Sequence, residues 1–418
     1  MPAVLSVAIM FLVGVGSRFE AKEKNGVTHF LEHMLFKGTK KRPTAKKLAE
    51  IIDSIGGEWN AATGKESTAY YIKASVSNLK RAFEILSDMV INPLLSEREI
   101  EKEKNVIISE IAMYEDTPTR RVAEIFEELL YPDCALGWDI AGIPESVMNI
   151  KKSDFLTLRK QFYTPHNMVI TVAGGIKEKD VTKLAERYLG SLNSGEARKT
   201  AQRERFLQKE PRALVRYKDT DQAHSVIGVR GNPRGHPDRW AEEILSSILG
   251  GGMSSRLWIA VRERRGLAYY VRSEIEHYQD NGYFAIYSGV DPKHAYKAIQ
   301  VILSEIHSFK AGKGFTDREL KKGKEYVKGH LDLSLEDTRS VAGFMGSFEL
   351  LEDRIFTPEE IKEKIDAVTQ KDVVRVANEF FVPERLNLAV IGPYKDGGKF
   401  EKVLQFLNGS KEHPKPIF

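Results

Sequence analysis

The sequence has almost no cysteine. Cys134 is the only one among 418 residues, so no internal disulfide can form. A chain without disulfides is typical of a reducing compartment, and we therefore expect a cytoplasmic protein. A lone thiol is more often a small buried hydrophobic group than a nucleophile, and nothing near Cys134 in the sequence indicates otherwise.

The sequence also lacks an excess of charge of one sign. Its 63 Lys and Arg residues and its 59 Asp and Glu residues leave a net charge of only +4. Such a small excess argues against a nucleic acid or a membrane surface as the partner. No phosphate-binding glycine loop, paired CxxC motif or basic-aromatic patch is present either. The usual sequence signals of nucleotide-binding and nucleic-acid-binding proteins are therefore missing.

The strongly apolar stretch at residues 1–15 is too short to span a bilayer. No Lys or Arg precedes it, which disfavours a signal peptide. Its many β-branched residues, followed by Gly14 and Gly16, instead predict a buried strand. With 42% hydrophobic and 29% charged residues, the composition is that of an ordinary globular protein. The length predicts two domains of about 200 residues each.

What the sequence does contain is a cluster of metal-binding residues at positions 26–38. The stretch predicts a short amphipathic helix with His29, Glu32 and His33 on one face. The apolar residues between them face inward: Phe30, Leu31, Met34 and Leu35. Two imidazoles on adjacent turns can bind one zinc ion, and a glutamate beside them can take a proton from an activated water. The pattern is His-x-x-Glu-His, a zinc-protease signature.

A third ligand is expected downstream, because catalytic zinc usually has three protein ligands. Residues 96–114 predict a charged helix on which Glu103 and Glu110 lie two turns apart and so share a face. Without the upstream motif, both would be read as surface carboxylates. With it, they are candidates for the metal site.

These residues resemble those of the pitrilysin or inverzincin family, which includes insulin-degrading enzyme and the mitochondrial processing peptidases. The spacings from His33 to Glu103 and from Glu103 to Glu110 are similar to those of the processing-peptidase branch, and the chain resembles a short two-domain bacterial-type member. The resemblance implies one Zn²⁺ per chain, bound by His29, His33 and Glu110. It further implies that Glu32 is the general base and that Glu103 supports the site.

A strand of small, uncharged residues is predicted within residues 58–63. It contains Asn60, Ala61, Ala62 and Thr63, and a second strand is predicted at 67–74. One interpretation is that the small side chains only pack under the zinc helix. In the family that the chain resembles, the corresponding strand lies at a sheet edge and pairs with the substrate backbone.

The chain repeats itself, which indicates two related domains. Residues 96–100 are echoed at 316–320, and residues 154–165 at 372–383. The charged stretch 194–213 is predicted to be a linker between a catalytic domain at 1–193 and an inactive copy at 214–418. The second copy has no His-x-x-Glu-His motif. We expect an α+β fold with two homologous domains, each a mostly antiparallel sheet packed against helices.

The second copy has its own candidate residues. A helix at 255–264 and a strand at 267–273 are predicted, with Arg262 on the first and Tyr269 on the second. They resemble an Arg/Tyr pair that contacts the substrate and the reacting carbonyl in this family. The alternatives are a surface arginine in a basic run and a core tyrosine, and a one-residue slip would put Tyr270 in place of Tyr269. Gly250, Gly251 and Gly252 fit either a helix-ending turn or a substrate contact.

Together the residues favour a zinc-dependent endopeptidase that acts on unfolded or extended peptides. The competing hypothesis is a non-catalytic subunit that binds peptides or stabilises an assembly, and the presence of Glu32 argues against it. Since four-domain relatives join two halves in one chain, this two-domain chain is expected to form a homodimer. Arg262 and Tyr269 would then serve the zinc of the partner subunit in trans.

Overall fold

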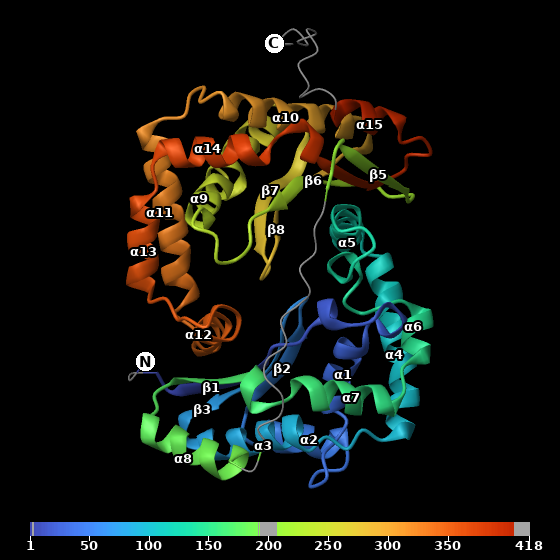
Figure 1. The fold of residues 1–418 in the computed structure, drawn as a ribbon, viewed down its shortest axis with the longest axis vertical. Helices are drawn as coiled ribbons and strands as arrows, with labels where there is room; N and C mark the ends of the chain where they lie inside the picture. Colours follow the sequence, from blue (N-terminus) through green and yellow to red (C-terminus); the bar gives the residue numbers. More distant parts are fainter. Residues whose placement is uncertain (2–3, 191, 193–206, 405–418) are drawn as a thin grey trace. The chain divides into compact units, whose positions relative to one another are not determined.

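The computed structural model describes residues 1, 4–190, 192 and 207–404. The chain forms two compact units, each assembled from three segments (Figure 1). Unit 1 comprises Met1–Met113, Cys134–Gln202 and Asp332–Phe356, and unit 2 comprises Tyr114–Asp133, Arg203–Leu331 and Thr357–Phe418. The sequence halves predicted at 1–193 and 214–418 thus each give one internal segment to the other unit.

Unit 1 has a four-stranded antiparallel sheet in the order β2-β3-β1-β4. Its strands are β1 (Ser6–Val13), β2 (Glu58–Thr63), β3 (Thr68–Ser75) and β4 (Met168–Gly174). Its helices are α1 (Val27–Leu35), α2 (Ala45–Ser54), α3 (Leu79–Ile91), α4 (Glu97–Glu115), α6 (Pro144–Asn149), α7 (Lys152–Phe162), α8 (Glu178–Leu189) and α12 (Thr338–Glu352). The strand predicted within residues 1–15 is confirmed as β1.

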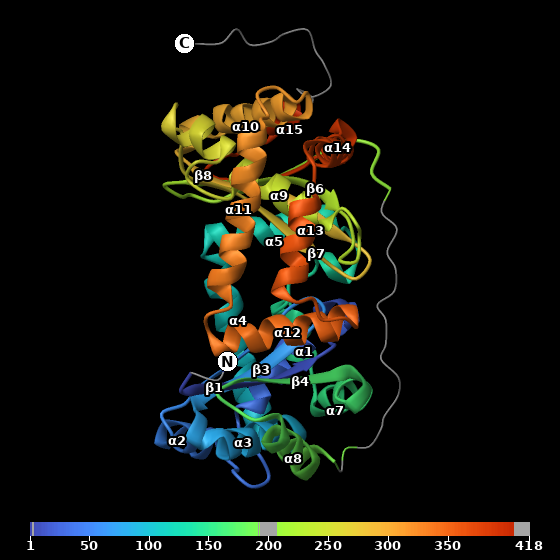
Figure 2. The ribbon, with the colours of Figure 1, turned by 90° about the vertical axis from the view of Figure 1, so that its left-hand side faces the viewer.

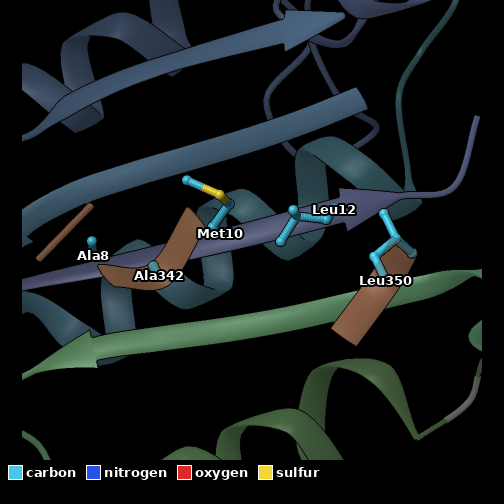
Figure 3. Close-up of a cluster of buried hydrophobic side chains, with 5 residues drawn as sticks. All are labelled: Ala8, Met10, Leu12, Ala342 and Leu350. Carbon is cyan, nitrogen blue, oxygen red and sulfur yellow. The ribbon is translucent and has the colours of Figure 1, made fainter. Parts of the chain in front are cut away.

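Strand β1 is buried on both faces, which explains its unbroken apolar sequence. Phe11 packs against Phe83 of α3, with ring centroids 6.0 Å apart. Figure 2 shows α3 and α12 on opposite sides of this sheet. On the α12 side, Ala8, Met10 and Leu12 form a buried cluster with Ala342 and Leu350 of that helix (Figure 3). A strand that alternates its side chains between two covered faces needs apolar residues at every position.

Helix α12 is therefore part of the core of unit 1, although it comes from the second half of the sequence. It approaches the sheet closely, since a Cβ at Gly346 would lie 2.5 Å from a methyl carbon of Leu12. The hydroxyl of Thr171 on β4 also donates a hydrogen bond to the carbonyl of Ala342 at 2.8 Å. This burial of apolar surface is the physical reason that the unit takes in the segment.

Unit 2 has a five-stranded sheet in the order β5-β9-β6-β8-β7. Its strands are β5 (Arg212–Tyr217), β6 (Ala223–Gly231), β7 (Ala268–His277), β8 (Gly282–Val290) and β9 (Asn387–Gly392). Only the β5–β9 pair is parallel. Read from the other edge, β7-β8-β6-β9 repeats the order β2-β3-β1-β4 of unit 1. The predicted α+β fold with two homologous, mostly antiparallel domains is confirmed.

The helices of unit 2 include one from the first half of the sequence. They are α5 (Pro118–Leu130), α9 (Arg239–Gly250), α10 (Ala295–Lys310), α11 (Asp317–Ser334), α13 (Pro358–Ala367), α14 (Gln370–Phe380) and α15 (Gly398–Leu404). Helix α5 packs on β6 and β9. A Cβ at Gly228 would lie 2.8 Å from the ring of Phe126, and the hydroxyl of Tyr131 donates to the carbonyl of Gly282 at 2.7 Å. Helix α5 thus comes from the first half of the sequence but belongs to unit 2, and α12 comes from the second half but belongs to unit 1.

Most of the predicted linker, residues 194–206, lies outside the described residues. Its last residues belong to unit 2, because β5 already begins at Arg212. The side chain of Gln208 donates to the carbonyl of Leu386 at 3.1 Å. Among the described residues, no helix is both long and apolar enough to cross a membrane.

Candidate metal centre

Helix α1 carries the His-x-x-Glu-His motif, and it buries the opposite face. It begins after Gly26, whose φ of 95° is favoured by glycine. Four inward-facing side chains of this helix are fully buried: Phe30, Leu31, Met34 and Leu35. Phe30 packs on Phe155 of α7, with ring centroids 5.0 Å apart. This apolar face orients the helix so that His29, Glu32 and His33 project from its other side.

Helix α4 brings Glu110 against these histidines. Nε2 of His29 lies 3.8 Å from Oε1 of Glu110, and Nε2 of His33 lies 3.4 Å from Oε2. The three potential ligand atoms all lie within 4.8 Å of one another. Their side chains are 12%, 21% and 20% exposed, so the group is accessible to a small ligand. Among the described residues, this is the one cluster of three or more such groups that could hold a metal ion.

The donor set fits zinc. Bonds of about 2.0–2.2 Å in a tetrahedral arrangement bring ligand atoms to about 3.4 Å from one another. The two His–Glu110 separations of 3.4 and 3.8 Å are close to that value, and all three ligand atoms lie within 4.8 Å of one another. Two imidazoles and one carboxylate are also the ligand types of many catalytic zinc sites, which leave a fourth position for water. His29, His33 and Glu110 are therefore able to hold the ion together.

Glu103 is on α4, like Glu110, and contacts the Nδ1 side of the His33 ring. Its Oε1 is 2.9 Å from Nδ1 of His33, and its Oε2 is 2.6 Å from Nζ of Lys37. Burial alone would raise the pKa of Glu103, but the bonds from His33 and Lys37 lower it. Glu103 is thus a carboxylate that fixes the ring of His33 and leaves Nε2 facing the metal position.

The pKa of His33 is also set by its glutamate neighbours. Burial disfavours the imidazolium, but hydrogen bonds to Glu103 and Glu110 outweigh burial and raise the pKa of His33 to about 9. A metal ion competes with that proton for Nε2, so metal binding at this site releases a proton.

Glu32 lies one turn after His29 on α1 and contacts the last residue of β2. The hydroxyl of Thr63 donates a hydrogen bond to its Oε2. Burial raises the pKa of Glu32, and the bond from Thr63 partly opposes the rise. A carboxylate with a raised pKa is well suited to accept and return a proton near neutral pH.

Strand β2, with Asn60, Ala61, Ala62 and Thr63, lies at the edge of the unit 1 sheet. Within the described part of the chain it pairs only with β3. The predicted edge position is therefore observed, while the pairing with a substrate stays a prediction.

Arg262 and Tyr269 lie in unit 2, whereas the candidate metal ligands lie in unit 1. The predicted helix at 255–264 is mostly a π-helix, Trp258–Glu263, which carries Arg262. Nη1 of Arg262 donates to the carbonyl of Tyr269, and its guanidinium lies 5.6 Å from the centre of the Tyr269 ring. The two predicted residues are thus in contact with each other.

Tyr269 occupies an irregularity in β7. Ala268 pairs with Val290 but Tyr270 pairs with Gly289, so Tyr269 is the extra residue of a β-bulge. A bulge redirects its side chain, and Tyr269 is 70% exposed. The hydroxyl of Tyr270 instead lies 3.1 Å from Nδ1 of His224, within the unit. Of the two tyrosines considered, Tyr269 is the more exposed, and its contact with a substrate stays a prediction.

The triple glycine is accounted for by packing. A Cβ at Gly250 would lie 2.3 Å from the backbone nitrogen of Ser273. Cβ atoms at Gly251 and Gly252 would lie 3.0 and 3.1 Å from the ring of Tyr326 on α11. Larger side chains would therefore push β7 and α11 away from the end of α9.

The sequence motifs did not reveal two contacts of this site. Lys37 stands four residues after His33, the spacing of helical neighbours, and this could have indicated a shared partner. The bond between Thr63 and Glu32 joins residues 31 apart in the sequence and has no local signal.

The chain is similar to known proteins along most of its length. Residues 2–141 match the family model "Insulinase (Peptidase family M16)", and residues 149–327 match "Peptidase M16 inactive domain". The uncharacterized zinc protease YmxG of Bacillus subtilis is 38% identical over 393 residues, which cover 94% of each chain. An uncharacterized zinc protease of Rickettsia felis is 35% identical over 401 residues, again 94% of each chain.

Solved structures with the same fold include a protease from Helicobacter pylori. Its TM-score is 0.88 at 26% identity, and the match covers 93% of this chain and 94% of that one. A peptidase M16 inactive domain from Pseudomonas fluorescens has a TM-score of 0.85 at 18% identity, with 94% of each chain covered. The second likeness is one of fold alone.

Proposed function

The chain belongs to peptidase family M16, and from this premise we propose that it is a zinc-dependent endopeptidase that cuts unfolded or extended peptides. Its curated relatives bear the name zinc protease. The observation that carries the proposal is the cluster of His29, His33 and Glu110, with Glu32 one helical turn from His29. The metal is one zinc ion per chain.

The chemistry divides between the metal and the side chains around it. When bound, zinc would supply Lewis-acid activation of a water molecule and of the scissile carbonyl. Glu32 accepts the proton that the water loses and then passes it to the leaving amine. Glu103 holds His33 in one orientation through Nδ1.

The substrate is bound as an added strand. Asn60, Ala61, Ala62 and Thr63 form the open edge of the unit 1 sheet, and a peptide that pairs with this edge must be extended. The last of these residues, Thr63, is bonded to Glu32. Backbone pairing along β2 would thus bring a peptide bond close to the general base.

Arg262 and Tyr269 complete the site from a second copy of the chain. A guanidinium can hold a substrate carbonyl, and a tyrosine hydroxyl can donate to a developing oxyanion. We propose a homodimer in which this pair serves the metal site of the partner subunit across a two-fold axis. The lone Cys134 fits the cytoplasmic location that we propose.

Two measurements test the proposal against the alternative of a non-catalytic peptide-binding subunit. Metal analysis of the purified protein should give one zinc ion per chain. A quenched, unstructured peptide should be hydrolysed, and removal of zinc by a chelator should abolish the activity. Peptide binding without hydrolysis by the zinc-loaded protein would favour the non-catalytic subunit.

A further inference from the structure

Helix α1 lacks the usual cap at its N-terminus. The N-cap position is Gly26, which has no side chain to accept a hydrogen bond from the first turn. The helix is only 9 residues long, too short to be stable by itself in water. Yet its first turn contains His29, so any movement there displaces a proposed metal ligand.

Glu20 takes over the role of the missing cap from six residues upstream. Its Oε1 accepts the backbone N–H of Thr28 at 2.8 Å, and its Oε2 accepts the backbone N–H of Gly26 at 2.7 Å. The side chain of Asn25 donates to the same Oε2 at 3.0 Å. Both oxygens of Glu20 are thus used as hydrogen-bond acceptors.

The surrounding backbone leaves this turn little freedom. A Cβ at Gly26 would lie 2.5 Å from the carbonyl oxygen of Ala141, and one at Gly142 would lie 2.3 Å from the carbonyl oxygen of Asn25. Asn25 also donates to the carbonyl of Asp139 at 2.9 Å. The entry to α1 is therefore packed against a neighbouring segment by backbone contacts.

Glu20 itself is held in place from the other side. Arg18, two residues before it, forms a buried ion pair with Glu66 at 2.6 Å. The backbone N–H groups of Ser17 and Arg18 donate to the carbonyls of Gly64 and Lys65. Gly64 and Lys65 directly follow β2, whose last residue Thr63 is bonded to Glu32. One short segment thus connects the end of the edge strand with the start of the metal-binding helix.

We propose that Glu20 is a positioning residue for the metal site, which holds the first turn of α1 so that His29 presents its imidazole to the ion. The hydrogen bonds that Glu20 accepts come from Asn25, Gly26 and Thr28, and none of them involves a side chain of the proposed metal ligands or Glu32. It acts through the backbone of Gly26 and Thr28. The inference rests on the proposed zinc site and adds a residue to it.

The test is Glu20→Gln. An amide has only one acceptor oxygen, so one of the backbone N–H groups of Gly26 or Thr28 would face an NH₂ donor instead. Residues that orient a metal ligand from outside typically change metal affinity 10- to 100-fold when substituted. We expect the folded variant to bind zinc at least about 10-fold more weakly in competition with a chelator. The visible absorption of the cobalt-substituted protein should change as well, because the geometry at His29 changes.

Glu242→Gln is the matched control. Glu242 on α9 is also a fully buried glutamate, and its Oε1 accepts from Asn232. Its Oε2 has no hydrogen-bond partner among the described residues and lies 3.7 Å from Nε2 of His277. A glutamine can keep the first bond there, so this variant should bind zinc like the wild type.

The outcomes separate the two levels of the proposal. Failure of the wild-type protein to bind zinc would refute the proposed function. Wild-type zinc affinity and an unchanged cobalt spectrum in folded Glu20→Gln would overturn the positioning role alone. If Glu20→Gln does not fold, Asn25→Ala removes one donor to the same side chain and leaves both oxygens of Glu20 in place. That variant should weaken zinc binding several-fold, and an affinity equal to that of the wild type would overturn the inference.

Discussion

The hydroxyl of Thr63 donates a hydrogen bond to Oε2 of Glu32, so the last residue of the edge strand is bonded to the proposed general base. Strand β2 has no other strand on its outer side among the described residues. The strand proposed to bind substrate and the carboxylate proposed to move the proton are therefore joined directly by this hydrogen bond.

Thr63→Val should lower kcat while zinc content stays at one ion per chain. Valine keeps the shape of threonine but cannot donate, and a hydrogen bond to a charged group contributes about 1.5–3 kcal/mol. We expect a loss of about 10-fold or more in peptide hydrolysis. Thr63→Ser retains the hydroxyl and is the control. Equal kcat values for the valine and serine variants would show that the contact does not orient Glu32.

Glu32→Gln should retain zinc and lose peptidase activity. The amide has nearly the same shape as the carboxylate but cannot accept a proton, and removal of a general base typically costs about 10²–10⁴ in rate. His33→Ala should instead lose the metal. Zinc analysis and a quenched-peptide assay on both variants separate these effects, and near-normal turnover by Glu32→Gln would remove the proposed mechanism.

Folded proteins should resist cleavage while their unfolded forms are cut. Pairing with β2 requires an extended backbone, which a stable domain does not expose. One substrate domain and a destabilised variant of it, compared at equal concentration, provide matched sequences. Rapid internal cleavage of the stable form would count against binding at the β2 edge.

Two inactive variants should restore activity when their subunits exchange. Mixing Glu32→Gln with Arg262→Ala makes half of the dimers mixed, and each mixed dimer has one complete site of two. Roughly a quarter of the wild-type activity should then return. Replacing the second partner by the double variant Glu32→Gln/Arg262→Ala should return none. No recovery in the first mixture, despite demonstrated exchange, would mean that Arg262 does not act in trans.

Unit 2 should lose stability as the pH rises through neutrality, because of one buried acid. Burial raises the pKa of Glu242 to about 7, although the bond from Asn232 opposes the rise. The stability due to the neutral acid is complete below its unfolded pKa near 4.5 and is lost as pH rises through 7. Glu242→Gln removes this titration.

Chemical unfolding at pH 5 and pH 8 measures the effect. The free energy of unfolding should fall less between these values for Glu242→Gln than for the wild type. Burial lowers the pKa of the adjacent His277 to about 4, so its own contribution has the opposite sign, being lost as the pH falls. Because His277 lies 3.7 Å from Glu242, the difference between the two proteins measures the titration of Glu242 together with its coupling to His277. Identical pH dependence would contradict the prediction.

Local periodicity explains how much of this protein could be predicted. In a helix, residues three and four apart share a face, so the grouping of His29, Glu32 and His33 follows from the chain order alone. The strand at β2 was predicted with its observed bounds from small and β-branched residues between turns. The repeat was visible because two related segments keep similar residues at similar spacing, and the two sheets have the same strand order.

The sequence by itself thus determined the helix and strand around the candidate site, the repeat and the candidate metal ligands, since each depends on residues close together in the chain or on a spacing that resembles a known family. Only the tertiary structure decided that α5 and α12 cross to the other unit, that Tyr269 bulges outward and that Glu20 caps α1. These features depend on which buried surfaces and backbone groups need a partner once the chain is folded. Such partners come from distant parts of the sequence, and no local pattern records them.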